Sequence, residues 1–573
     1  MKPAQPHRRP ARPHDALARA LSAVRAVRAV VAVRAVRSMR GVHGLRGARQ
    51  RTIASLLAGA MTLGALAPGL ALAQVRLPSL GESASDDLSV SAERRIGLEI
   101  MRQARRDPLF LDDPLLQAYI VSLWQPLLDA ARARGEITPE TDQAFAWEAF
   151  LVLDRSVNAF AMPGGYIGVH LGLIAITQTR DQLASVLAHE LAHVTQRHIA
   201  RSISVQQQAS LLSIATTILG ILAASRSSNI DAASAAIYGG QAVAMQGQLN
   251  YSREMEREAD RIGYTLLGSA GFSTIGMAQM FERMDQANRL NDSGAFPYLR
   301  SHPLTVERMS EARTRTLLPG STAAAPPLLH ALMQARARVL MDPSVQGLQR
   351  LNGESSSPQR SDQFGALYAG AMGALLLNDP ARGDRLAQAA LSLHDALPEA
   401  EREPAAAAAV QLLRSQLLLA ARDTTGALRV VDAAASEGAA APALLRRPLL
   451  LQRAQAVLEL HRQQGGAAAA QLRRSTETLQ TWLADHPEDA SVWQMLSFTT
   501  DAGGLRLRSL RAAAEARAAV GDLNGAIDRL RVAQAATRGT DAADFIEASV
   551  IDARLRQLEG ERRQLMVEAR GGR

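Results

Sequence analysis

The feature that most constrains this chain is a pair of histidines four residues apart, His189 and His193, in the sequence HELAH. Residues at this spacing lie on one face of an α-helix, so both imidazoles can reach one cation. Residues 181–199 have apolar side chains at helical spacing and no proline or glycine, which predicts a helix with Asp181 as its N-cap. Glu190, between the two histidines, can face a water molecule on that cation.

Two histidines at this spacing also arise by chance on core helices, so the metal hypothesis needs another ligand. Residues 251–267 predict a second helix, on which Glu256 and Asp260 are four residues apart and share a face. Glu256 as the third ligand and Asp260 as a carboxylate bonded to a ligand histidine would complete a His-His-Glu site with one position open to water. The alternative is a solvated charged face, because other charged residues surround both positions.

Four motifs in order, over roughly Asp112 to Met309, carry a resemblance to a known family. They are NAFAMPGGYI, HELAH, EREAD and SHPLTVER. The chain resembles the zinc metalloproteases that include HtpX, the CAAX prenyl endopeptidases and the mitochondrial Oma proteases. The resemblance implies a zincin-like α+β fold, mostly helical, and one Zn²⁺ per chain.

Within the EREAD motif, the resemblance places the ligand glutamate at Glu256, four residues before Asp260. In the mechanism that it implies, Glu190 accepts a proton from the attacking water and returns it to the leaving amine. We expect residues 143–154 to form a strand at a sheet edge above the cleft, where an unfolded substrate could pair as an added strand.

A third histidine, His302, stands before Pro303, with Arg308 six residues further on. In relatives, such a pair lies near the zinc and holds substrate or the developing oxyanion. In BepA-like members, the matching histidine is thought to occupy the fourth zinc position and to keep the enzyme inactive, because it displaces the catalytic water. The sequence leaves both roles open, together with a surface loop position. His198 follows His193 by about 140° around a continuous helix, so we expect it not to share the metal.

The C-terminal half indicates which branch of the family the chain resembles. From Leu328 onward, Ala- and Leu-rich helical segments alternate with short breaks, and residues 521–533 echo residues 422–434 about three 34-residue periods earlier. This pattern is similar to degenerate tetratricopeptide repeats, or else to a plain helical domain. Segment PGSTAAAPP at 319–327 predicts a linker. We therefore expect a metalloprotease domain over 74–322 and a tetratricopeptide-like all-α solenoid over 323–573.

The N-terminus accounts for the apparent basicity of the chain. Residues 1–52 hold thirteen of the 64 Lys and Arg but one of the 55 acidic residues, so the remainder has a net charge of −3 and gives no case for nucleic-acid binding. Residues 52–73 are apolar and end in Ala71-Leu72-Ala73, which predicts a signal peptide cleaved near Ala73-Gln74 behind a basic extension. The alternatives are a retained membrane anchor and, for the extension, a later start at Met39.

The resemblance to the BepA-like periplasmic members implies a periplasmic metalloendopeptidase for misfolded or stalled outer-membrane proteins. It also implies a chaperone role and contact with the outer-membrane assembly machinery. The different hypothesis is a chaperone or scaffold with a latched, mostly inactive zinc site. Residues 210–225 are apolar but short for a membrane span, and we expect a buried or lid helix that allows peripheral membrane contact. The chain has no cysteine, which excludes disulfides.

Overall fold

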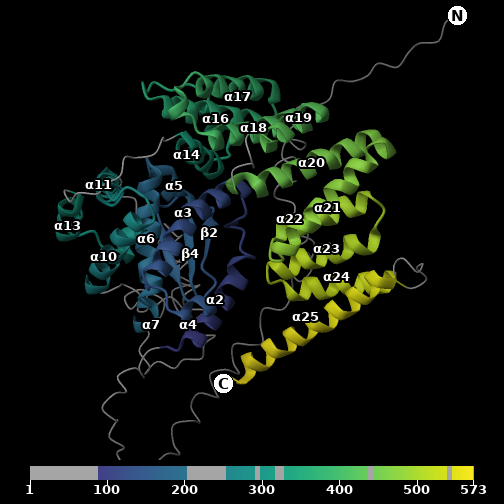
Figure 1. Ribbon diagram of the computed structural model, residues 1–573, viewed down its shortest axis with the longest axis horizontal. Helices are drawn as coiled ribbons and strands as arrows, with labels where there is room; N and C mark the ends of the chain where they lie inside the picture. Colours follow the sequence, from purple (N-terminus) through teal and green to yellow (C-terminus); the bar gives the residue numbers. More distant parts are fainter. Residues whose placement is uncertain are drawn as a thin grey trace, which may run out of the picture.

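The computed structural model describes residues 88–202, 253–290, 297–316, 328–436, 443–537 and 545–571. Figure 1 shows a part that contains a small sheet, with the C-terminal helices arranged around one side of it. The predicted mostly helical α+β class is confirmed, because helices surround a single small mixed sheet in the described ranges. The linker at 319–327, the segment 210–225 and the N-terminal extension with its signal peptide lie outside the described residues.

The part that contains the sheet is built from the first half of the chain. Its elements are α2 (Val90–Ala104), β1 (Phe110–Leu111), α3 (Pro114–Ala133), α4 (Pro139–Ala144), β2 (Glu148–Val152), β3 (Ala159–Met162), β4 (Tyr166–His170), α5 (Leu171–Ile176), α6 (Arg180–Thr195), α7 (His198–Ser202), α10 (Arg253–Ser269), α11 (Ile275–Leu290), α12 (Tyr298–Ser301) and α13 (Val306–Thr316).

The sheet has the order β1-β2-β4-β3. β2 runs parallel to β4, whereas β1 and β3 are antiparallel to their neighbours. β3 and β4 form a hairpin whose turn places Gly164 and Gly165 at φ of +79° and +83°, a region that glycine adopts readily. The order corrects one expectation: the strand within 143–154 is β2, an inner strand, and the strand at the edge beside α6 is β3.

The helix that carries HELAH differs from the prediction at both ends. Its N-cap is Thr179, whose side chain accepts a hydrogen bond from the Gln182 amide, so the expected cap at Asp181 is wrong. Asp181 is buried in the first turn and accepts from the Ser273 amide at 3.0 Å. The helix was predicted to continue to residue 199, but it ends at Thr195. The backbone changes direction at Arg197, which has φ of +51°.

Helix α10 packs directly on α6, and glycine makes this approach possible. A Cβ atom at Gly263 would lie 3.1 Å from the Ala188 carbonyl oxygen and from the His189 amide nitrogen. That distance is shorter than most contacts of real Cβ atoms, so a larger residue would require the two helices to shift slightly. Close packing here brings the side chains of α10 within reach of the HELAH motif.

The C-terminal region is entirely helical over the described residues. Its elements are α14 (Leu328–Met341), α15 (Val345–Arg350), α16 (Arg360–Leu376), α17 (Pro380–Asp395), η3 (Glu399–Glu401), α18 (Pro404–Ala420), α19 (Thr424–Ser436), η4 (Ala443–Leu445), α20 (Arg446–Gln464), η5 (Gly465–Ala468), α21 (Ala469–Asp485), α22 (Ala490–Ala502), α23 (Arg506–Ala519), α24 (Leu523–Ala536) and α25 (Phe545–Gly571).

Consecutive helices of this region pack against one another, as Figure 1 shows for α16 to α18 and for α20 to α25. Aspartates begin several of these helices: Asp379, Asp489 and Asp522 each accept a hydrogen bond from the amide three residues later. The two alanines that the repeat pattern aligns, Ala427 and Ala526, are fully buried. Small residues at such positions allow close helix packing.

Ion pairs join the two parts of the protein through the start of α3. Asp112 accepts hydrogen bonds from Arg447 of α20 at 3.0 and 3.1 Å and from Ser491 of α22. The neighbouring Asp113 caps α3 and pairs with Arg336 of α14 at 2.7 Å. Arg336 also donates to Tyr368 at 2.8 Å, so this buried charge pair has several hydrogen bonds. Such bonds favour a fixed orientation of the C-terminal helices on the sheet-containing part.

Buried His330 makes a second connection between the parts. Its Nδ1 lies 2.7 Å from the Tyr119 hydroxyl and its Nε2 lies 2.9 Å from the Thr177 carbonyl oxygen. Burial, together with the positive charge of Arg338, lowers the pKa of His330 to about 4 although the bond to Thr177 opposes this. His330 is therefore neutral near pH 7, donating from Nε2 and accepting the tyrosine hydrogen at Nδ1.

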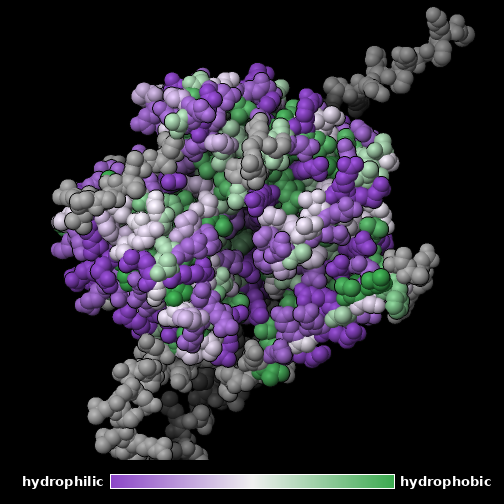
Figure 2. Space-filling model, in the orientation of Figure 1, coloured by the Kyte–Doolittle hydropathy of each residue, from purple (hydrophilic) through white to green (hydrophobic). Residues whose placement is uncertain are grey.

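The surface is largely hydrophilic in the view of Figure 2, and it is hollowed between the sheet-containing part and the C-terminal helices. Larger exposed apolar side chains gather on α25, at Phe545, Ile546 and Val550. Of the helices that the structure describes, none is both long enough and apolar enough to cross a bilayer.

Candidate metal centre

Helix α6 presents both histidines of HELAH toward the same point. The Nε2 atoms of His189 and His193 lie 3.0 Å apart, and the two residues are 2% and 0% exposed. Two buried imidazole nitrogens that face each other in this way must share a proton or a cation. The helical spacing thus produces the convergence that the sequence predicted.

Helix α10 adds Glu256 to this point. Its carboxylate oxygens lie 3.4 Å from His193 Nε2 and 3.5 Å from His189 Nε2. Asp260, one turn further along α10, places Oδ1 2.9 Å from His189 Nδ1, on the side of the ring that faces away from the cluster. The structure therefore brings Asp260 to the outer nitrogen of His189, where the sequence had placed a supporting carboxylate.

His302 follows the short helix α12 and lies inside the cluster. Its Nδ1 is 2.8 Å from Glu256 Oε1 and 3.4 Å from His189 Nε2. Ligand atoms of His189, His193, Glu256 and His302 all lie within 4.8 Å of one another. The ring of Tyr298 stacks on His302 at a centroid distance of 4.6 Å, which holds the imidazole from its other side. Sequence reasoning had not singled out Tyr298.

Arg308 of α13 lies behind the cluster and is 5% exposed. Its guanidinium donates to Asp260 at 2.6 and 2.8 Å, and its NH1 lies 2.8 Å from Glu256 Oε2. The same NH1 donates to the Pro303 carbonyl oxygen at 3.0 Å. The Arg308 guanidinium therefore directs its donors at Asp260, at Glu256 and at the loop that carries His302, and it orients these groups.

Glu190 of α6 is completely buried. Its Oε2 accepts a hydrogen bond from the Ala161 amide of the edge strand β3 at 3.0 Å. Its Oε1 makes no hydrogen bond to the described part of the chain and lies 3.6 Å from His302 Nε2. The predicted base is therefore adjacent to the cluster and is oriented by the main chain of an edge strand.

His198 was expected to stay away from the metal, and its ring is not among the four clustered ligands. The turn at Arg197 nevertheless directs it at His193, with the two Nδ1 atoms 2.8 Å apart. The other nitrogen of His198 lies 3.0 Å from Glu258 Oε2. On a continuous helix His198 would point about 140° away from His193, so the expectation from the sequence missed this contact. No local sequence signal marks the bend.

Electrostatics at the centre favour charged carboxylates. Burial opposes ionisation of Glu256, but His302, His189 and His193 outweigh it and hold the pKa of Glu256 far below its usual range. Asp260 is similar: burial is outweighed by Arg308 and His189, which lower its pKa to about 2. Burial lowers the pKa of His189, yet Asp260 and Glu256 raise it overall, to about 9.

The donor set fits a divalent metal. Three imidazoles and one carboxylate are typical zinc ligands, and their ligand atoms already converge. One buried carboxylate oxygen here, Glu190 Oε1, makes no hydrogen bond within the described residues, whereas Glu256 Oε2 is paired with Arg308. Buried carboxylate oxygens without hydrogen bonds are costly unless a cation or its water approaches them.

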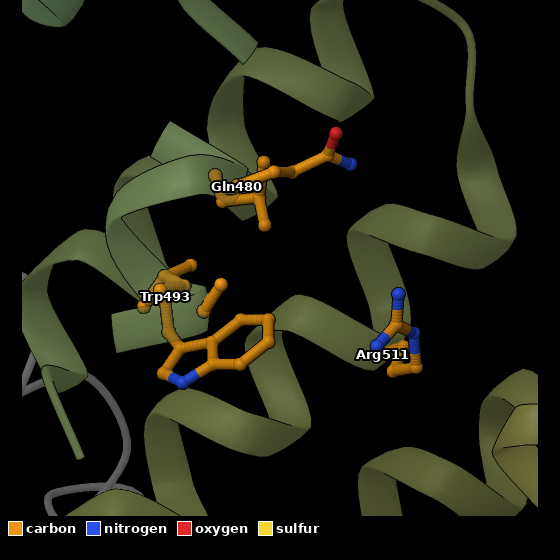
Figure 3. A pocket seen from close by; sticks show the side chains of 6 residues that line it. Gln480, Trp493 and Arg511 are labelled. Atoms are coloured by element: carbon orange, nitrogen blue, oxygen red, sulfur yellow. The ribbon is translucent and has the colours of Figure 1, made fainter. Parts of the chain in front are cut away.

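A separate pocket lies between α21, α22 and α23 (Figure 3). Its walls include Gln480, Trp493 and Arg511, with apolar side chains between them. The guanidinium of Arg511 is hydrogen-bonded to Glu547 of α25, so its charge is already compensated. The residues that line this pocket include no metal-ligating pair.

A helix with two histidines, a second helix with a glutamate and a short sheet define the chain as a metallopeptidase by its architecture. Residues 116–316 match the model of peptidase family M48. The chain is 30% identical over 508 residues to a beta-barrel assembly-enhancing protease of Yersinia pestis, a match that covers 88% of this chain and 96% of that protein. The chain therefore belongs to peptidase family M48.

Other relatives match a shorter region at higher identity. A putative beta-barrel assembly-enhancing protease of Vibrio cholerae is 37% identical over 290 residues, 51% of this chain and 56% of that protein. A beta-barrel assembly-enhancing protease of Escherichia coli is 37% identical over 268 residues, 47% of this chain and 52% of that protein. The chain thus matches about half the length of these two curated relatives.

Proposed function

We propose that this protein is a zinc-dependent metalloendopeptidase of the periplasm that acts on misfolded or stalled outer-membrane proteins. The observation that carries the proposal is the convergence of His189, His193, Glu256 and His302 beside a buried Glu190. The names of the relatives, which are proteases that enhance the assembly of beta-barrels, support the substrate class.

His189, His193 and Glu256 would hold the ion, with Asp260 and Arg308 orienting their side chains. A bound Zn²⁺ supplies Lewis acidity, which makes water nucleophilic near neutral pH and polarises a peptide carbonyl. Glu190 takes a proton from the attacking water at its free Oε1 and delivers it to the amine that leaves. The Ala161 amide keeps the carboxylate in position throughout.

The substrate strand would add to β3, the edge of the sheet nearest Glu190. Main-chain hydrogen bonds along such an edge depend little on the side chains of the substrate. Phe160 and Ala161, both partly exposed, would line the site. This mode of binding suits a protease whose substrates are unfolded and differ in sequence.

The C-terminal helices would serve as a tetratricopeptide-like repeat domain, over residues 323–573, that engages the outer-membrane assembly machinery. Consecutive helices that pack on one another, with buried small residues at Ala427 and Ala526, support this assignment. A signal peptide within residues 1–73, cleaved near Ala73-Gln74, would deliver the protein to the periplasm. Residues 74–322 would then form the protease domain.

A second function, that of a chaperone or scaffold with a latched zinc site, is favoured by one specific observation. His302 lies within the cluster and 2.8 Å from the proposed ligand Glu256, close enough to serve as a further ligand. With this histidine as a fourth ligand, the centre is closed. The two functions are compatible if the latch opens when substrate binds.

Digestion of casein and of an unfolded porin tests the proposal, with zinc content measured on the same samples. Wild-type protein with one zinc per chain should cleave both substrates, whereas Glu190→Gln should keep the zinc and lose cleavage. Cleavage that survives in a clean Glu190→Gln preparation would remove Glu190 from its role. A protein that binds no stoichiometric zinc would overturn the proposal.

A further inference from the structure

The two ligand histidines of α6 use the same ring nitrogen for the cluster. The Nε2 atoms of both His189 and His193 face the centre, which leaves each Nδ1 on the outside. A metal ion takes the lone pair of Nε2, so each outer Nδ1 must carry the ring proton. Each histidine therefore needs an outer acceptor that fixes its tautomer and its ring orientation.

The outer group beside His189 is the Asp260 carboxylate, whose Oδ1 lies 2.9 Å from Nδ1. The outer group at His193 is a second imidazole, because His198 Nδ1 lies 2.8 Å from His193 Nδ1. Two facing Nδ1 atoms at this distance can hold only one proton between them. With that proton on His193, the Nδ1 atom of His198 must accept the hydrogen bond. The ring proton of His198 is then on its Nε2.

The far side of His198 satisfies that requirement. Its Nε2 lies 3.0 Å from Glu258 Oε2, a carboxylate oxygen that accepts the N–H. Arg201 donates to the same oxygen at 3.1 Å, which holds the carboxylate at the edge of the fold. The His198 side chain is fully buried, whereas that of Glu258 is 31% exposed.

We propose that His198 and Glu258 are positioning residues for the metal ligand His193, together doing for His193 what Asp260 does for His189. Glu258 accepts a hydrogen bond from the N–H at His198 Nε2, and His198 Nδ1 accepts a hydrogen bond from the N–H at His193 Nδ1. The Nε2 atom of His193 then directs its lone pair toward the ion. His193 and His198, the first and last residues of HVTQRH, come into contact only because the chain bends at Arg197. The inference rests on the metal site of the proposed function and deepens it.

The test compares zinc affinity, measured by competition with a chromophoric chelator, across variants of the full chain. His198→Leu removes the acceptor and should weaken zinc binding about tenfold or more. His198→Asn keeps an oxygen where Nδ1 was, so it should retain most of the affinity. Glu258→Gln, at a partly exposed position, should cause an intermediate loss. His394→Asn, a buried histidine of α17, is the matched control and should leave the affinity unchanged.

A role in packing alone would give a different pattern. It would lower the urea midpoint of the chelator-treated protein in His198→Leu without changing its zinc affinity, and that result overturns the inference. Equal losses of affinity in His198→Asn and His198→Leu also overturn it, because the acceptor would then be irrelevant. Wild-type protein that binds no zinc would instead defeat the proposed function itself. If His198→Leu fails to fold, the zinc affinities of His198→Asn and Glu258→Gln decide. The inference requires a larger loss in Glu258→Gln than in His198→Asn.

Discussion

His302 Nδ1 lies 2.8 Å from Glu256 Oε1 and within hydrogen-bonding range of His189 Nε2 at 3.4 Å, so the histidine that follows α12 shares the space of the proposed zinc ligands. Its ring stacks on that of Tyr298 at a centroid distance of 4.6 Å. A side chain held in this way competes with water for the fourth position of a zinc ion.

We therefore expect His302→Ala to cleave casein several-fold faster than wild type at saturating zinc, because the variant frees a coordination position. Zinc affinity should fall in the same protein, since one ligand has been lost. Cleavage rates and chelator competition, measured side by side, check both effects. A slower rate at full zinc occupancy would show that His302 stabilises the oxyanion instead.

Arg308 contacts Glu256 and Asp260 of α10, and its removal should mainly affect stability. Breaking a buried ion pair leaves uncompensated charge and costs about 3–5 kcal/mol. We expect Arg308→Ala to lose about this much unfolding free energy in the presence of a chelator, and less with zinc bound, because the ion neutralises Glu256. The unfolding free energy of Arg308→Lys should lie between those of wild type and Arg308→Ala, since an ammonium group cannot bridge Asp260 and Glu256.

Urea unfolding of the three proteins, with zinc and with chelator, measures these differences. The Arg338→Ala variant serves as a control, because Arg338 is an exposed arginine of α14 that donates to the Ala175 carbonyl oxygen, away from the metal centre. An equal loss for Arg308→Ala in both conditions would contradict the electrostatic coupling to the metal centre.

The sequence was most informative where chemistry depends on spacing within one helix. His189, Glu190 and His193 are ordered by the helical repeat, and α6 presents them as expected. Glu256 could be selected from its charged neighbours only through the family resemblance, because several carboxylates of that helix have the same local pattern. Its position beside α6 depends on Gly263, whose tolerance of close packing is a tertiary property.

Three features could not be obtained from local sequence. The left-handed conformation at Arg197 redirects His198, although arginine rarely adopts it. The edge position of β3 depends on the order of all four strands, and each strand alone is compatible with several orders. The ion pairs of Asp112 and Asp113 join residues hundreds of positions apart, for which a single sequence carries no signal.

Zinc binding should depend on pH through His189. Asp260 and Glu256 raise the pKa of this imidazole to about 9 in the metal-free centre, so a proton must leave before the ion binds. The apparent affinity should rise about tenfold per pH unit between pH 6 and 8, and level off near pH 9. Chelator competition at fixed ionic strength measures the slope. A flat profile would show that His189 is neutral without metal.

The connection through His330 should make the protein less stable in acid. The pKa of this histidine is about 4 in the folded protein, because burial disfavours its charged form, and about 6.5 when unfolded. The unfolded chain therefore binds the extra proton between these values. Stability is full above pH 6.5 and falls as the pH decreases toward 4, by up to about 3 kcal/mol.

His330→Gln should remove this part of the pH dependence, because the amide can still donate to Thr177 and does not titrate. The measurement is the urea unfolding free energy at pH 7.5 and pH 5 with a chelator present, so that the metal centre contributes equally to both proteins. His394→Gln, at another buried histidine, should keep the wild-type pH dependence. If His330→Gln and wild type lose the same free energy between the two pH values, His330 does not link the two parts through its neutral form.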